Sequence, residues 1–112
     1  MIRVSFLHQG DELIGFLANG HALYDDPGKD IVCAAVSAVL ITAGNALERV
    51  AHVRVDTQSQ SGGMRVVMSE NPEGERGIKA QAILAAARSG LLDIQRQYPG
   101  FVRVYRIEQR RR

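Results

Sequence analysis

The chain has 112 residues, of which 46% are hydrophobic, and this length encloses one core but is too short for two, so residues 1–112 are expected to form a single domain. The net charge of +2 does not by itself indicate nucleic acid, and an aromatic content of 5% offers few rings for base stacking. Residues 1–56 carry four Lys or Arg against seven Asp or Glu, and residues 57–112 carry ten against five. The basic end, residues 109–112, is predicted to be a disordered tail.

The sequence predicts no internal disulfide, no secretory signal and no membrane span. One cysteine cannot form an internal disulfide, and the N-terminus lacks the pattern of a secretory signal, so we expect a cytoplasmic protein. The longest apolar stretch, Ile31 to Ala43, is too short to span a bilayer, so no membrane partner is expected.

The first half of the chain predicts a hairpin and then a helix. Apolar and polar residues alternate over 2–6, a turn follows at 10–11, and 13–17 form the returning strand. A loop over 19–29 leads to Asp30, a good N-cap for a helix that continues to about Arg49.

The second half predicts a hairpin, a helix and a last strand. In chain order these are a strand at 53–55, a turn at 60–63, a strand at 64–68, an exposed connection at 70–77, a helix at 78–98 and a strand at 101–107. The order strand-strand-helix-strand-strand-helix-strand favours an α+β fold. We expect a two-layer domain with a mainly antiparallel sheet of about five strands and two helices.

The first predicted helix is apolar on nearly every side of its first turns. Such a helix is expected to be buried on most faces. A subunit interface would bury it, and so would a second helix that crosses it within the core.

Cys33 is the third residue of that helix, where backbone N–H groups lack partners and the helix dipole is positive. This environment favours the thiolate, which is the reactive form of cysteine. The free N–H groups are expected to hold the oxyanion of an acyl-transfer intermediate. Asp30, Cys33 and Ser37 are spaced to lie along one face of the helix.

His21 ends the second predicted strand, and the loop after it can double back toward the thiol. A cysteine with a histidine base within reach is the minimum equipment for acyl transfer. Gly20 and Gly28 are candidate hinges for closure of the loop over a substrate.

Each of these residues also has a simpler interpretation. A lone cysteine in a helix is usually a small hydrophobe, and Asp30 as a cap opposes a thiolate with its charge. Ser37 can bond its own backbone, and His8 and His52 are expected at the surface or at strand edges. The histidines share no ligand spacing and phosphate-binding glycine loops are absent, so no metal or cofactor is expected.

The residues Gly20-His21-Ala22 and Gly28-Lys29-Asp30-Ile31-Val32-Cys33-Ala34-Ala35-Val36-Ser37 resemble the signature of the ribosomal-processing cysteine proteases called Prp. The resemblance extends over nearly the whole chain. It implies removal of a short N-terminal extension from the precursor of large-subunit ribosomal protein twenty-seven, by cleavage after an aromatic residue, and a homodimer.

The same resemblance implies roles for single residues. Cys33 would be the nucleophile and His21 its base, with Asp30 and Ser37 in supporting positions and Gly20, Ala22 and Gly28 on a substrate loop. The chain departs from the family pattern at Leu23 and at Asp25-Asp26-Pro27. The acidic residues there would attract a basic substrate.

Two other functions stay open at this point. The basic second half would suit a non-catalytic ribosome-assembly or RNA-binding module, and the apolar helix would suit a structural dimer without an active site.

Overall fold

The computed structural model describes residues 1–26 and 30–109, so the tail residues Arg110 to Arg112 and Gly28 lie outside the described part. Its elements follow the predicted order. They are β1 (Ile2–Gln9), β2 (Glu12–Asn19), α1 (Ile31–Arg49), β3 (Val55–Gln60), β4 (Gly63–Met68), α2 (Gly74–Gln97) and β5 (Val102–Glu108). Gln109, where the tail was predicted to begin, donates its backbone N–H to the carbonyl oxygen of His8 at 2.7 Å.

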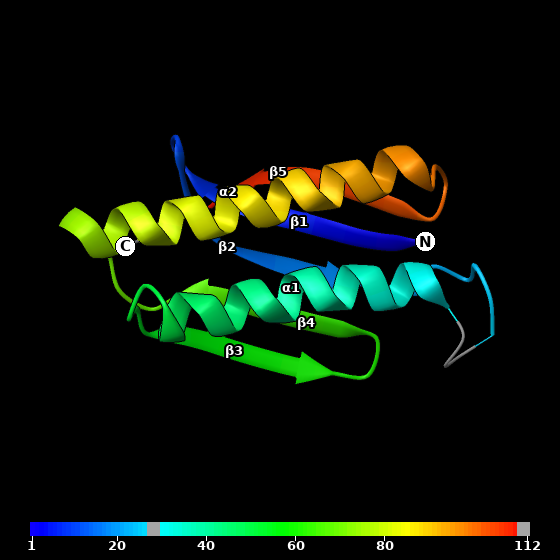
Figure 1. The fold of residues 1–112 in the computed structure, drawn as a ribbon, viewed down its shortest axis with the longest axis horizontal. Coiled ribbons are helices and arrows are strands. Elements are labelled where there is room, and N and C mark those ends of the chain that lie inside the picture. Colours follow the sequence, from blue (N-terminus) through cyan, green and yellow to red (C-terminus); the bar gives the residue numbers. More distant parts are fainter. Residues whose placement is uncertain (27–29, 110–112) are drawn as a thin grey trace.

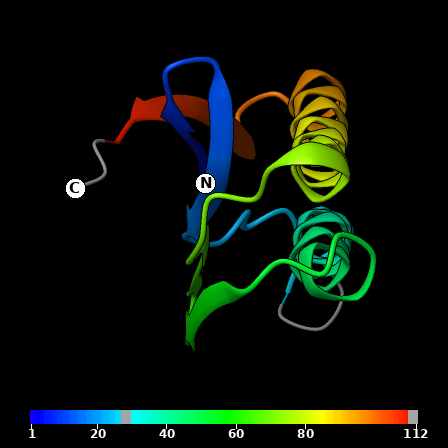
Figure 2. The ribbon, with the colours of Figure 1, turned by 90° about the vertical axis from the view of Figure 1, so that its left-hand side faces the viewer.

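The five strands form one sheet in the order β3-β4-β2-β1-β5. The first three neighbouring pairs are antiparallel, and β1 and β5 are parallel. Both helices lie on the same face of the sheet, next to each other, which gives two layers (Figures 1 and 2). The predicted α+β class and the mainly antiparallel sheet are therefore confirmed.

The core lies between these layers. Each helix buries residues three or four positions apart, which is the spacing of one helical face. In α1 they are Val32, Val36, Leu40, Ala43, Gly44 and Leu47, and in α2 they are Ala80, Leu84, Ala87 and Leu91. The prediction that α1 is buried on most faces is wrong for a single chain, because Ile31 and Ile41 are 54% and 50% exposed.

Two boundaries differ from the prediction. The helix α2 begins at Gly74, one turn inside the predicted connection, because the Gly77 N–H already donates to Glu73 and an ion pair of 3.1 Å joins Lys79 to Glu75. The strand β3 begins later than predicted. Val53 is buried but belongs to the link after α1, where its N–H donates to the Leu47 carbonyl at 2.9 Å.

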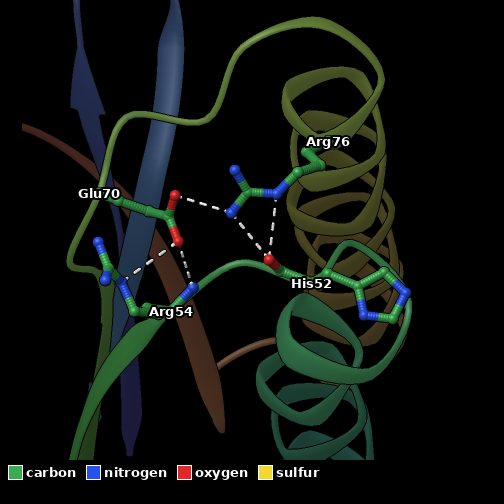
Figure 3. Close-up of polar contacts among 4 residues, drawn as sticks. All are labelled: His52, Arg54, Glu70 and Arg76. Carbon is green, nitrogen blue, oxygen red and sulfur yellow. Dashed lines mark hydrogen bonds and ion pairs between the residues drawn. The ribbon is translucent and has the colours of Figure 1, made fainter.

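A polar cluster joins the start of α2 to the link before β3 (Figure 3). The Glu70 carboxylate accepts from the Arg54 N–H at 2.9 Å and pairs with the Arg76 guanidinium at 2.7 Å. Arg76 also donates to the His52 carbonyl, at 3.1 and 2.8 Å. The Arg54 N–H and then the Arg76 guanidinium hold the pKa of Glu70 below its usual value.

His8 is buried at 2% exposure, so the prediction of a surface or strand-edge position is wrong. The alternation that predicted β1 continues from Phe6 to His8 and places it on the buried side. Its Nε2 lies 3.4 Å from the Arg88 guanidinium. Burial, and then the charges of Arg106 and Arg88, lower the pKa of His8, against opposing contributions from Glu108 and Asp11.

Among the described residues, α1 as a whole is long enough and apolar enough to cross a membrane by length and composition. The stretch Ile31 to Ala43 was predicted to be too short to span a bilayer, but the helix continues beyond it to Arg49. One face of α1 packs on the sheet and on α2, and the core helix of a soluble protein meets the same criterion.

Candidate active site

The thiol of Cys33 is held at the start of α1, two residues after the first residue of the helix. Its side chain is half-buried and free of any disulfide. Asp30 is the N-cap, as predicted, and its Oδ1 accepts from the N–H groups of Val32 and Cys33, both at 3.0 Å. The cap fixes the backbone that carries the sulfur.

The N–H groups of Val32 and Cys33, predicted to be free for an oxyanion, are already bound. Asp30 occupies both of them, and its carbonyl accepts from Ala34 at 3.1 Å. A different donor faces the sulfur, because the N–H of Ala22 donates to the Cys33 Sγ at 3.4 Å. Ala22 belongs to the loop between β2 and α1 and is 3% exposed.

The second carboxylate oxygen of Asp30 organises that loop. It accepts from the N–H of Tyr24 at 3.0 Å and from that of Asp25 at 3.4 Å. Desolvation acts to raise the pKa of Asp30, but the N–H groups of Cys33, Tyr24 and Asp25, together with the Cys33 thiol, outweigh it and hold that pKa below its usual value. Asp30 therefore joins the helix, the thiol and the loop as a carboxylate.

His21 lies two residues after the end of β2, and its side chain is exposed. Its neighbours on both sides are anchored. The Gly20 N–H donates to the Gly62 carbonyl in the β3–β4 turn at 2.9 Å, and the Ala22 N–H binds the thiol. A side chain at Gly20 would collide with the Met1 carbonyl, so this hinge candidate is packed firmly, and Gly28, the other one, lies outside the described residues.

Two hollows meet at the thiol, and His21, Cys33 and Ser37 line both. The first, of about 330 Å³, lies between β2, α1 and the β3–β4 hairpin and has an apolar wall. Its apolar residues are Ile2, Ala18, Val36, Leu40, Ile41 and Met64. The second, of about 400 Å³, lies under the loop and is lined by Leu23, Asp25, Asp30 and Ala34 as well.

Cys33 and His21 thus face the same cleft from two elements, while Ser37 stands one turn farther along α1. Among the described residues no hydrogen bond joins the His21 ring to the thiol, and catalytic hydrogen bonds often tighten only when substrate binds. Within residues 1–26 and 30–109 no group of three His, Cys, Asp or Glu could hold a metal ion. A capped thiol and an imidazole that line one cleft are the groups that a cysteine peptidase needs.

The model of the family described as cysteine protease Prp matches residues 1–103. The chain belongs to this family. A ribosomal processing cysteine protease Prp of Bacillus subtilis is 30% identical over 107 residues, covering 93% of this chain and 96% of the relative. The resemblance drawn from the motif is confirmed.

Solved structures of a Staphylococcus aureus Prp are also similar. One, with a covalently linked product peptide, has 26% identity and a TM-score of 0.85 over 96% of this chain and 100% of the other. A second, with a substrate peptide, has 25% identity and a TM-score of 0.80 over the same shares.

Two features of the site were not foreseen. The donor on the sulfur is a backbone group, for which side-chain patterns carry no signal. The contact of Gly62 with the loop joins segments about forty residues apart, and the Gly62-Gly63 pair in the sequence indicated only a turn.

Proposed function

We propose that the chain is a cysteine endopeptidase that removes the short N-terminal extension of large-subunit ribosomal protein twenty-seven during ribosome assembly. One observation carries the proposal: in a member of the Prp family, Cys33 and His21 line the same cleft. The names of the similar proteins, a ribosomal processing protease and a protease with a covalently linked product peptide, support it.

In this mechanism His21 takes the proton of the Cys33 thiol, and the thiolate attacks the carbonyl carbon of the scissile peptide bond. A C–S bond forms, and the C=O π pair moves onto oxygen. The Ala22 N–H, which already faces the sulfur, stabilises that oxyanion. When the intermediate collapses, the C–N bond breaks and His21 gives its proton to the leaving amine.

A thioester of the N-terminal fragment remains on Cys33. His21 then takes a proton from a water molecule, whose oxygen attacks the thioester carbon. A second collapse breaks the C–S bond, the carboxylic acid leaves, and His21 returns its proton to the Cys33 thiolate. Bond making and proton transfer thus balance with water as the second reactant.

Asp30 and Ser37 support this reaction in different ways. Asp30 positions the loop that carries His21 and Ala22, through its bonds to Tyr24 and Asp25. Ser37 lies where a peptide crosses from one hollow to the other. The carboxylate of Asp25 in the second hollow favours basic side chains of the substrate.

We also propose a homodimer that acts in the cytoplasm. Its contact uses the outer stripe of α1, which we define as Ile31, Ala34, Ala38 and Ile41, all of them exposed, so the second copy would border the hollows that Ala34 and Ile41 also line. A second copy that covers this stripe would remove two half-exposed isoleucines from water. Sedimentation of Ile31→Glu tests this, because Ile31 lines neither hollow. A variant that sediments like the wild type, whether as monomer or as dimer, counts against the stripe as the contact.

The activity itself is tested by incubating the purified protein with the ribosomal protein precursor. Cleavage should vanish in Cys33→Ala, fall to a slow residual rate in His21→Ala and persist in His52→Ala, since His52 is exposed and lines neither hollow. An uncut precursor together with salt-sensitive RNA binding would favour the RNA-binding module instead.

A further inference from the structure

We propose that Gly62, in the turn between β3 and β4, is a positioning residue that seats the ring of His21. The inference rests on the proposed function, in which His21 is the base. Its first support is the backbone bond of 2.9 Å from the Gly20 N–H to the Gly62 carbonyl. This bond ties the residue before the base to a turn that belongs to another hairpin.

The second support is the contact between the turn and the ring. A β-carbon built on Gly62 would lie 3.2 Å from Nε2 and 3.8 Å from Cε1 of His21. The imidazole therefore rests on the side of Gly62 where any other residue carries its side chain. Gly62 also has φ +77, a conformation that other residues rarely adopt.

Together with the thiol, the turn holds the base from both sides. Gly62 anchors Gly20, the Cys33 sulfur anchors Ala22, and His21 stands between them. The ring is exposed, so few other contacts fix its direction. A methyl group on Gly62 would push the ring away from the turn, and a misplacement of about 1 Å costs a catalytic group about 10²-fold in rate.

The test compares Gly62→Ala with Gly100→Ala. Gly100 has φ +88, but a β-carbon there would meet nothing within 4 Å, so it matches the backbone strain without the contact. The ring-proton signals of His21, assigned by their loss in His21→Ala, are followed by NMR. Cleavage of a precursor peptide gives kcat and KM, and thermal unfolding shows that each variant is folded.

We expect the ring signals of His21 to shift in Gly62→Ala and to stay in place in Gly100→Ala. We also expect kcat to fall about 10²-fold in Gly62→Ala, with a smaller change in KM. In the His21→Ala background Gly62→Ala should cost nothing further, because the two residues act through one ring.

Unshifted ring signals in Gly62→Ala overturn the proposal, whatever the activity. A further loss of the residual rate when Gly62→Ala is added to His21→Ala overturns it as well, and so does an equal loss of kcat in Gly62→Ala and Gly100→Ala. If the ring signals shift but the wild-type protein leaves the peptide uncut, the seat of the ring is supported and the proposed function fails.

Discussion

Replacing the peptide bond between His21 and Ala22 with an ester removes the N–H that donates to the Cys33 sulfur at 3.4 Å. Lactic acid in place of Ala22 keeps the methyl group and exchanges N–H for oxygen. A synthetic segment 1–32 can be ligated to an expressed segment that begins at Cys33, because the chain has one cysteine and the junction needs one. The product is the full chain with one hydrogen-bond donor deleted.

The expected loss follows from the surroundings of that donor. Ala22 is 3% exposed, so water cannot take the place of its N–H. The bond to sulfur is long, and the donor is worth more once a charged oxygen forms beside it. Deleting one oxyanion donor costs about 10²–10³-fold in kcat, or about 2.7–4 kcal/mol. The lost resting bond should lower folding stability by only about 1 kcal/mol.

Cleavage of the precursor peptide measures kcat and KM. Binding of a peptide aldehyde gives an independent measure, because its adduct with Cys33 carries an oxygen in the same place. The control is an ester at Tyr24, which removes a loop bond of 3.0 Å to Asp30 but keeps the donor on the sulfur. If the two esters reduce kcat and aldehyde affinity equally, Ala22 is not the oxyanion donor and the reasoning fails.

Three further predictions concern the loop, a buried histidine and the core. Asp30→Asn keeps one oxygen for the helix cap but loses the second oxygen, which accepts from the loop, so kcat/KM should fall. Tm should fall less in Asp30→Asn than in Asp30→Ala. Equal Tm values for the two variants would contradict this. Because the pKa of His8 is lowered in the folded protein, unfolding takes up a proton below about pH 6.5. The free energy of unfolding, measured with urea, should therefore decline as the pH falls below that value. The decline should be less steep in His8→Asn than in His52→Asn. Leu84→Ala, at a site with 0% exposure, should cost about 2–5 kcal/mol in the same assay, and a loss below 1 kcal/mol would show a loosely packed core.

The fold was predictable where burial follows local spacing. Alternation identified the strands, and the Asp30 cap before a continuous apolar run identified α1. The order of the strands was not predictable, because it depends on contacts between the chain ends: β5 lies parallel to β1, and the Ile2 N–H donates to the Phe101 carbonyl at 2.9 Å. The start of α2 was missed because glycine and charged residues there resemble a loop, whereas the backbone bond at Gly77 already closes a helical turn.

The candidate site divides in the same way. Its two reactive side chains and its helix cap could be read from residue type and spacing, because a cap acts on the next turn of its own helix. The partner of each backbone N–H could not be predicted in this way, because Asp30 both caps the helix and occupies the donors that seemed free for an oxyanion.

Because Asp30 binds the N–H groups at the start of α1, the hydrogen-bond donor next to the sulfur comes from the loop and not from the helix. Since the N–H groups of Val32 and Cys33 are bound, the donor on the sulfur comes from Ala22, directly after His21. In the proposed mechanism one short segment therefore carries both the base and the oxyanion donor, and any motion of that segment changes both at once. We therefore expect the bonds that fix it, from Gly62 on one side and from Asp30 on the other, to control the rate through geometry rather than through direct contact with the substrate.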